Sequence, residues 1–285
     1  NPMFFTGLMK KLGIKMQVFK VGTYKSAVEP YIAEQMSDAN REQVSSYQQS
    51  IWNNMLKDVA KSRKTTAEAL NSLADSLTIL SGPEASVKGG LVDKLCYQDE
   101  VKKILKNKAK MDEDESLRFV SISDVALSEE LNDKVDDEIA VYYAYGEIKE
   151  DITGGFAQES AITSKQMTKD LQELREDDDV KAVVLRVNSP GGSAYASEQI
   201  WREVQLLSKE KPVIVSMGAL AASGGYYISC GANKIFAEPT TLTGSIGIFG
   251  MFPDFSELLT QKLGLKFDLI KTNKFSDFGN SSRSY

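Results

Sequence analysis

Residues 182–192 read Ala182-Val-Val-Leu-Arg-Val-Asn-Ser-Pro-Gly-Gly192, an almost continuous apolar run that ends in a Pro-Gly-Gly turn. Such a run is typical of a strand that is buried on both faces of a parallel sheet. Apolar residues at helical spacing occupy residues 167–174 and 200–207, on either side of this run. Further strands are predicted at residues 139–145, 213–217 and 235–237. This alternation predicts an α/β architecture with buried parallel strands.

The turn at residues 188–192 has two interpretations. Proline fixes one φ angle, and the two glycines permit backbone conformations that a Cβ atom forbids. Backbone N–H groups that remain free just before a helix bind anions, including the oxyanion of an acyl-transfer intermediate. A plain connection between a strand and a helix fits the same spacing, and the residues alone leave both interpretations open.

A second candidate site follows the apolar run at residues 213–217, in the segment Met217-Gly-Ala-Leu-Ala-Ala-Ser223-Gly-Gly-Tyr-Tyr227. Small residues flank Ser223, so another backbone segment can approach its hydroxyl closely. We expect Ser223 at or near a helix N-terminus, where the helix dipole favours a developing alkoxide. A serine that merely caps the helix is an equal alternative. The motif is not Gly-x-Ser-x-Gly, so the nucleophile elbow of α/β-hydrolases is not indicated.

The chain of 285 residues contains no histidine, which excludes several mechanisms. A Ser-His-Asp or Cys-His pair cannot form within this chain, and neither can a His-ligated zinc or haem site. Cys96 and Cys230 are too few for a Cys₄ metal site or a disulfide framework, and their state stays open. We therefore predict no metal and no cofactor, and an acid–base catalyst must be Lys, Asp, Glu, Tyr or a thiol.

The net charge of −6 makes nucleic acid an improbable partner. The charge is also unevenly distributed, because residues 111–138 contain 11 acidic residues against Arg118 and Lys134. We interpret this segment as a solvated acidic linker; an acidic interaction patch is the alternative. No run of 18 apolar residues occurs, so no membrane-spanning helix is predicted.

The first part of the chain contains mainly helical patterns. Helices are predicted at residues 3–12 and 38–61, with a strand at residues 16–21 between them. Thr65-Thr-Ala-Glu68 resembles a capping box that opens a further helix.

An internal repeat links this first part to the end of the chain. Seven of the 24 positions from Phe4 to Ala27 are identical to the residues 251 positions later, while Lys25 faces Ser276. The length fits two domains. We therefore expect tandem domains: residues 1–110 as the C-terminal part of a first repeat, residues 111–138 as the linker, and residues 139–285 as the N-terminal part of a second repeat.

Three blocks together resemble a known family: residues 188–192, residues 217–227 and Leu242-Thr-Gly-Ser-Ile-Gly247. They are similar, in the same order, to the signature blocks of the signal peptide peptidase A (protease IV) family, which shares the ClpP/crotonase fold of repeated β-β-α superhelical units. Gly22-Thr-Tyr-Lys-Ser-Ala-Val-Glu-Pro30 resembles the lysine motif of the long, tandem-repeat members. The matched region spans nearly the whole chain.

This resemblance implies a serine protease with a Ser/Lys dyad. It implies that Ser223 is the nucleophile, that Lys25 is the general base and that Ser245 orients the lysine amine. It also implies an oxyanion hole formed by backbone N–H groups of Gly191 or Gly192 and of Gly224.

The role of Lys25 makes a physical demand on its surroundings. A free lysine has a pKa of about 10.4, and a useful base near neutral pH needs that value lowered by roughly 3 units, or about 4 kcal/mol. Burial among apolar groups lowers the pKa, provided that no carboxylate lies beside the amine. We therefore expect a buried Lys25 and a Glu29 side chain that points away from it.

The resemblance further implies short apolar peptides as substrates, in particular cleaved signal peptides. They would add as a strand beside Gly191 and Gly192. It implies a homo-oligomeric ring, a tetramer being one option, on the periplasmic face of a bacterial inner membrane, with an anchor expected upstream of Asn1. The sequence leaves open whether the dyad forms within one chain or between subunits.

Two alternatives remain. A crotonase-type acyl-CoA hydrolase or isomerase shares the fold and the oxyanion hole, and Gly90-Leu-Val-Asp93 resembles that superfamily. Such an enzyme has no need of the Lys25 block. A catalytically silent repeat scaffold is the other alternative, and the presence of the motif serines and the lysine argues against it.

Overall fold

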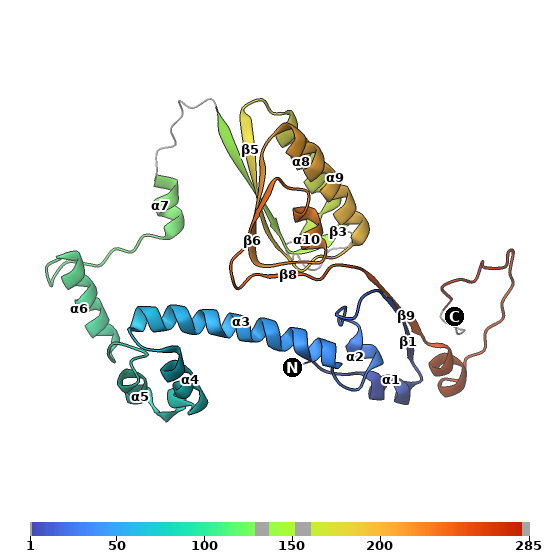
Figure 1. The fold of residues 1–285 in the computed structure, drawn as a ribbon, viewed down its shortest axis with the longest axis horizontal. Coiled ribbons are helices and arrows are strands. Elements are labelled where there is room, and N and C mark those ends of the chain that lie inside the picture. The colour runs from blue at the N-terminus through green and yellow to red at the C-terminus, as the bar shows by residue number, and fades with distance from the viewer. Residues whose placement is uncertain (1, 129–136, 152–160, 281–285) are drawn as a thin grey trace. The chain divides into compact units, whose positions relative to one another are not determined.

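The computed structural model describes residues 2–128, 137–151 and 161–280 (Figure 1). The chain forms two compact units. One consists of Asn1–Ser50 and Asp137–Tyr285, and the other of Ile51–Asp136.

A five-stranded parallel sheet forms the centre of the first unit. Its order is β2-β5-β6-β7, and β8 pairs with the last residues of β6. The strands are β2 (Glu138–Tyr145), β5 (Val180–Ser189), β6 (Val213–Ala222), β7 (Lys234–Phe236) and β8 (Leu242–Gly244). A smaller parallel pair is formed by β3 (Glu147–Lys149) and β4 (Ala161–Thr163). The predicted α/β class with buried parallel strands is confirmed.

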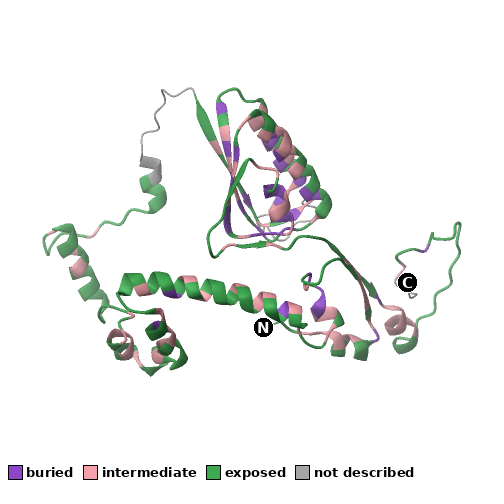
Figure 2. Ribbon diagram, in the orientation of Figure 1, coloured by how far each residue is buried: buried purple, intermediate pink, exposed green. Residues whose placement is uncertain are grey.

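Two helices pack against each other beside this sheet, α8 (Ser164–Glu176) and α9 (Ala194–Glu210). Figure 2 shows buried residues concentrated in β5, β6 and the sides of these helices. Thr163 and Ser193 cap the helices with their side chains, so α8 starts directly after strand β4 and α9 directly after the Pro-Gly-Gly turn. The core of the unit consists of fully buried aliphatic side chains, including Val183, Leu185, Val187, Ile200, Val204, Leu207 and Val215.

The N-terminal segment joins the second half of the chain through a two-stranded antiparallel ribbon. Strand β1 (Lys15–Lys20) pairs with β9 (Phe249–Asp254) over six Cα partners. Helix α1 (Thr6–Leu12) precedes β1, while α2 (Glu29–Ile32) and α3 (Asp38–Arg63) follow it. Helices α1 and α3 and strand β1 agree with the predicted elements to within a few residues, whereas α2 was not predicted.

The repeated sequence ends a helical segment at a left-handed glycine at both places, and the two copies differ after it. Helix α1 ends at Gly13, in the left-handed region at φ 75°, and β1 follows. The short π-helix η2 (Leu258–Lys262) is likewise followed by Gly264 at φ 70°. In the described residues 265–271 no strand follows this second glycine. The division into repeats at residues 1–110, 111–138 and 139–285 stays a prediction.

The second unit is helical. Besides the C-terminal half of α3, it contains α4 (Ala67–Asp75), the 3₁₀ helix η1 (Thr78–Ser81), α5 (Pro83–Lys88), α6 (Gln98–Ala109) and α7 (Ile122–Ser128). Thr66 caps α4 by accepting a hydrogen bond from the N–H of Ala69. The expected capping box at Thr65 was therefore wrong by one residue, because consecutive threonines offer two equivalent caps.

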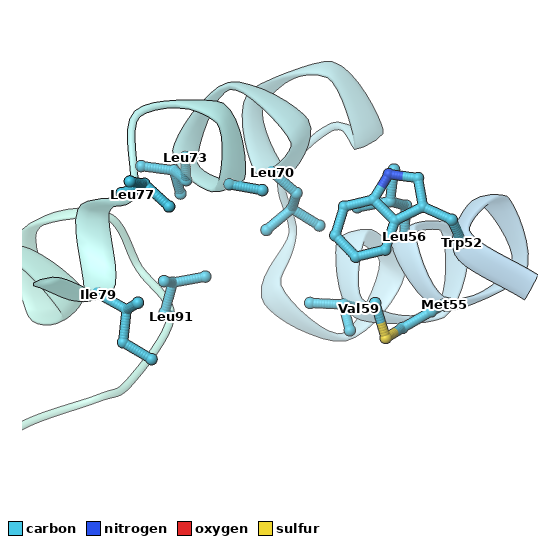
Figure 3. Close-up of a pocket in the computed structure, with 10 residues that line it drawn as sticks. Trp52, Met55, Leu56, Val59, Leu70, Leu73, Leu77, Ile79 and Leu91 are labelled. Carbon is cyan, nitrogen blue, oxygen red and sulfur yellow. The ribbon is translucent and has the colours of Figure 1, made fainter. Parts of the chain in front are cut away.

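This helical unit has a small apolar core of its own, which surrounds a cavity of about 350 Å³. Figure 3 shows Trp52, Leu56 and Val59 of α3 facing Leu70 and Leu73 of α4. The indole N–H of Trp52 donates to Asn71 Oδ1 at 2.9 Å, which satisfies the polar atom of a largely apolar side chain.

The predicted acidic linker, residues 111–138, contains α7 in its described part, and residues 129–136 lie outside the described residues. In the parts of the chain that the structure describes, no helix has the length and apolar character that crossing a membrane requires.

Candidate active site

Ser223 lies at the turn between strand β6 and the short helix α10 (Gly224–Ser229). Its backbone has φ 53° and ψ −118°, a conformation that costs a non-glycine residue about 1–3 kcal/mol. Its N–H donates to the carbonyl oxygen of Gly244 at 2.9 Å, which fixes the turn. The side chain makes no capping hydrogen bond to the helix, although Ser223 occupies the N-cap position. The hydroxyl thus stays available, and the capping alternative does not describe this serine.

The glycines after Ser223 are needed because α10 starts in very tight contact with its neighbours. A Cβ atom on Gly224 would lie 2.5 Å from Ser197 Oγ, and one on Gly225 would lie 2.6 Å from the carbonyl oxygen of Ser189. Neither distance is tolerable for a carbon atom. The Ser-Gly-Gly sequence therefore allows the helix to start directly against α9 and the end of β5.

The Pro-Gly-Gly turn after β5 lies against the same serine. Gly191 has φ 92°, and a Cβ atom there would lie 2.8 Å from Ser223 Cβ and 2.4 Å from the nitrogen of Gly224. Gly192 has φ 156°, and a Cβ atom there would lie 2.1 Å from the carbonyl oxygen of Ile148. Both glycines are required by close backbone approach, and this approach brings the two motifs together.

The N–H groups of this turn are not equivalent. That of Gly191 donates to Ser189 Oγ at 3.1 Å. In the described chain, the N–H groups of Gly192 and Gly224 donate to no protein acceptor. Two free N–H groups, one from each motif, flank Ser223, and such a pair suits the stabilisation of an anion.

Lys25 lies in the loop between β1 and α2 and is buried, with 7% of its surface exposed. Its Nζ donates to the carbonyl oxygen of Ser245 at 2.9 Å and to Ser245 Oγ at 3.1 Å. Burial lowers the pKa of Lys25. The nearby Glu29 carboxylate accepts hydrogen bonds from Ser37 and Asn40 instead, so it points away from the lysine as expected.

A cavity of about 530 Å³ joins these groups. Five of the six residues to which the resemblance gives roles line it: Lys25, Ser223, Ser245, Gly192 and Gly224. Gly191 does not line the cavity and lies behind it, against Ser223. All of these residues belong to the same compact unit.

The remaining cavity wall was not foreseen in full. It is mainly apolar or aromatic and consists of Ala194, Ser197, Tyr226, Tyr227, Cys230, Ile246, Gly247, Ile248 and Phe249. The ring of Tyr227 is held in place by its hydroxyl, which donates to Glu198, and by the ring of Trp201 at 5.9 Å. The run from Ile246 to Phe249 directly follows the Thr-Gly-Ser block. This position next to Ser245 could have indicated that these residues line the cavity. Cys96 and Cys230 are both free thiols.

Two protein-family models match the chain. The model described as peptidase family S49 matches residues 1–112 and 205–285, and the model described as Clp protease matches residues 130–242. The Clp protease match and the parallel sheet together confirm the expected ClpP-type α/β fold.

Three relatives match almost the whole chain. Protease 4 of Salmonella typhi is 38% identical over 97% of this chain and 45% of its own length. Protease 4 of Haemophilus influenzae is 36% identical over 96% of this chain and 46% of its own length. The chloroplastic serine protease SPPA of Arabidopsis thaliana is 33% identical over 96% of this chain and 40% of its own length. The chain thus spans less than half the length of these curated relatives.

Proposed function

Because the chain belongs to peptidase family S49, we propose that it is a serine endopeptidase in which Ser223 is the nucleophile and Lys25 the general base. One observation carries this proposal: a buried lysine amine and an uncapped serine hydroxyl line one cavity, although 198 residues separate them in the sequence. A dyad of this kind needs no histidine, and the chain has none.

The hydrogen bonds of Lys25 suit a neutral amine. A neutral amine has two N–H bonds and one lone pair, and the two acceptors on Ser245 use both N–H bonds. The lone pair then remains free to take the proton of Ser223 Oγ. Burial, which lowers the pKa of Lys25, favours this neutral state. Ser245 therefore acts as the orienting residue in the proposal.

The reaction proceeds in two stages. Ser223 Oγ attacks the peptide carbonyl carbon while its proton passes to Lys25 Nζ, and the electrons of the C=O bond move to the oxygen. The resulting ammonium returns this proton to the leaving amine as the C–N bond breaks, which leaves an ester on Ser223. A water molecule then attacks the ester carbonyl carbon while Lys25 takes one of its protons. The ammonium gives this proton to Ser223 Oγ as the C–Oγ bond breaks, which releases the carboxylic acid product and restores the free serine and the neutral amine.

The developing oxyanion would be bound by the N–H groups of Gly192 and Gly224. Of the two glycines in the first motif, Gly192 is the better candidate because the N–H of Gly191 already donates to Ser189. Loss of a single donor of this kind costs about 2.7–4 kcal/mol of transition-state stabilisation.

The cavity favours an apolar peptide in an extended conformation. Tyr226, Ile248 and Phe249 provide an apolar wall large enough for a substrate side chain. Gly192 forms an isolated parallel bridge with Ile148 on one side, which leaves its other edge for a substrate strand. Cleaved signal peptides fit this description, and the name of a similar protein in Enterococcus faecium, putative signal peptide peptidase SppA, supports that substrate class.

The resemblance to Protease 4 also supports a location and an assembly. We propose that the protein works as a homo-oligomeric ring, a tetramer being one form, at the periplasmic face of a bacterial inner membrane. A ring would admit extended peptides and exclude folded proteins. Sedimentation of the purified protein, together with fractionation of the cells that produce it, tests both points.

The activity is tested with an apolar fluorogenic peptide and three proteins: the unchanged chain, Ser223→Ala and Lys25→Ala. We expect hydrolysis only by the unchanged chain, and labelling of Ser223 by a serine-reactive fluorophosphonate. Full activity of either variant removes that residue from the mechanism. Turnover of an acyl-CoA thioester in place of the peptide favours the crotonase-type alternative instead.

A further inference from the structure

The loop that carries Lys25 is attached to helix α3 by the side chain of Gln43, in addition to a hydrogen bond between Tyr24 and Glu42. Gln43 Nε2 donates to the carbonyl oxygen of Tyr24 at 3.1 Å and to Ser26 Oγ at 2.5 Å. These two acceptors belong to the residues immediately before and after Lys25. The loop has little regular structure of its own, and the N–H of Lys25 makes only a long bond, 3.4 Å, to the carbonyl oxygen of Gly22.

The other end of this attachment is a buried carboxylate. Glu29 is 4% exposed, and its oxygens accept from Ser37 N at 3.1 Å, Ser37 Oγ at 2.5 Å and Asn40 Nδ2 at 2.8 Å. Burial alone would raise the pKa of Glu29, but these hydrogen bonds outweigh it and lower the pKa. The Glu29 carboxylate is thus hydrogen-bonded by neutral donors and not by the amine of Lys25.

Asn40 connects the two ends. Its Nδ2 donates to Glu29, and its Oδ1 accepts from Gln43 Nε2 at 3.3 Å. The Gln43 amide has only two N–H bonds for three acceptors, so its longest contact, to Asn40, shares an N–H with one of the other two. Asn40 thus links the Glu29 carboxylate to the residue that contacts both neighbours of Lys25. Asn40 and Gln43 lie in the first turns of α3. A rigid helix thus supports a loop that has little regular structure of its own.

We infer that Gln43 is a positioning residue for the general base, because it holds the backbone on both sides of Lys25 and so keeps the amine buried against Ser245. This inference rests on the proposed function. Without the Gln43 amide the loop can move outward, and water then reaches the amine. Hydration favours the ammonium form, which cannot accept the proton of Ser223.

Other ionisable groups near the loop are few. Lys20 on β1 interacts with Glu29, and Glu42 on α3 accepts from the hydroxyl of Tyr24 at 2.8 Å. Tyr226, Tyr227 and Cys230 line the cavity from α10 and its end. The opposite wall, residues 245–249, carries no ionisable side chain. None of these groups is changed by a substitution at Gln43.

The test compares Gln43→Leu with Gln48→Leu, which changes the same residue type at an exposed position of the same helix. For Gln43→Leu we expect kcat to fall about 10-fold with KM within about 2-fold, as for a misplaced catalytic base. The rising limb of its pH–rate profile should move to higher pH. Gln43→Glu, which supplies an anion in place of a donor, should move the limb further. Gln48→Leu should match the unchanged chain in every respect.

A second measurement does not depend on activity. Acylation of Lys25 by an amine-reactive reagent at a series of pH values, followed by peptide mass spectrometry, gives the pKa of this amine directly. We expect Gln43→Leu to raise it. An unchanged pKa and pH profile, with or without a fall in Tm, would overturn the inference while the proposed function stands. Full activity of Lys25→Ala would instead remove the function on which the inference rests.

Discussion

The amine of Lys25 lies 3.1 Å from the hydroxyl of Ser245, a residue 220 positions later in the chain. The contact depends on the antiparallel ribbon of β1 and β9, since β1 leads into the Lys25 loop and β9 begins just after the Ser245 turn. A long-range pairing of strands thus decides where the proposed base can lie.

The Ser245 hydroxyl is the first target for mutation. Ser245→Ala removes one of the two acceptors of the Lys25 amine and leaves the carbonyl oxygen in place. We expect kcat to fall about 10-fold, because one remaining hydrogen bond orients the lone pair less well. Steady-state kinetics on an apolar peptide measure the change. Ser45→Ala, on the exposed surface of α3, is the matched control. Equal activity of both variants would show that the hydroxyl orients nothing.

The burial of Lys25 predicts a dependence of stability on pH. Its pKa is lower in the folded chain than in the unfolded chain, so between these two values the unfolded chain binds more protons and stability rises with pH. Lys25→Met abolishes this titration. We expect it to unfold at a higher temperature than the unchanged chain at pH 7, and the difference should shrink as the pH rises toward about 10.4.

Thermal unfolding at a series of pH values from 6 to 10 measures the difference in Tm between Lys25→Met and the unchanged chain. Lys10→Met, which removes an exposed lysine from α1, is the control variant. A difference for Lys25→Met that does not change with pH would mean that the amine is not desolvated in solution.

The Gly192 backbone allows a test of the proposed oxyanion hole. A Cβ atom at this position would lie 2.1 Å from the carbonyl oxygen of Ile148, so Gly192→Ala must displace the turn. We expect at least a 100-fold loss of kcat, because the N–H moves away from the oxyanion, together with a lower Tm. Gly7→Ala, where a Cβ atom meets nothing within 4 Å, should leave both values near those of the unchanged chain. Near-normal turnover by Gly192→Ala would exclude this N–H from catalysis.

The β1–β9 register is open to a chemical test. Val18 and Met251 are paired in the ribbon, so Val18→Cys with Met251→Cys should form a disulfide on mild oxidation. Val18→Cys with Phe249→Cys is displaced by two residues and should not. Peptide mapping under non-reducing conditions distinguishes the new bond from any involving Cys96 or Cys230. Cross-linking of the displaced pair alone would show that the ribbon has a different register.

The central sheet could be predicted because short local sequence patterns identify its strands. The run in β5 is apolar on both faces, and a Pro-Gly-Gly turn ends it. Strand β6 also begins as an apolar run, and it extends to Ala222, five residues beyond the predicted end. The residues after Met217 are mainly small, and they show no apolar pattern from which a strand could be predicted.

The candidate site was predictable in its residues and less so in its geometry. From the residues alone, the side chain of Ser223 could either cap the helix or leave its hydroxyl free. The choice depends on the backbone conformation of Ser223, φ 53° and ψ −118°, which no residue pattern specifies. The choice between Gly191 and Gly192 depends on the hydroxyl of Ser189, which takes the N–H of Gly191. The contact of Gln43 with the Lys25 loop could not be predicted. Glutamines are common on long helices, and nothing in the sequence distinguishes this one.

The β1–β9 ribbon also governs when the site can exist. A growing chain that has been synthesised as far as Ser223 contains both reactive side chains but lacks Ser245, the cavity wall at Phe249 and the partner strand of β1. The same holds for a chain that has been cut and has lost its last segment. In the proposed mechanism such molecules would leave the polypeptides around them uncut, because the Lys25 amine gains its Ser245 partner only after the ribbon has closed.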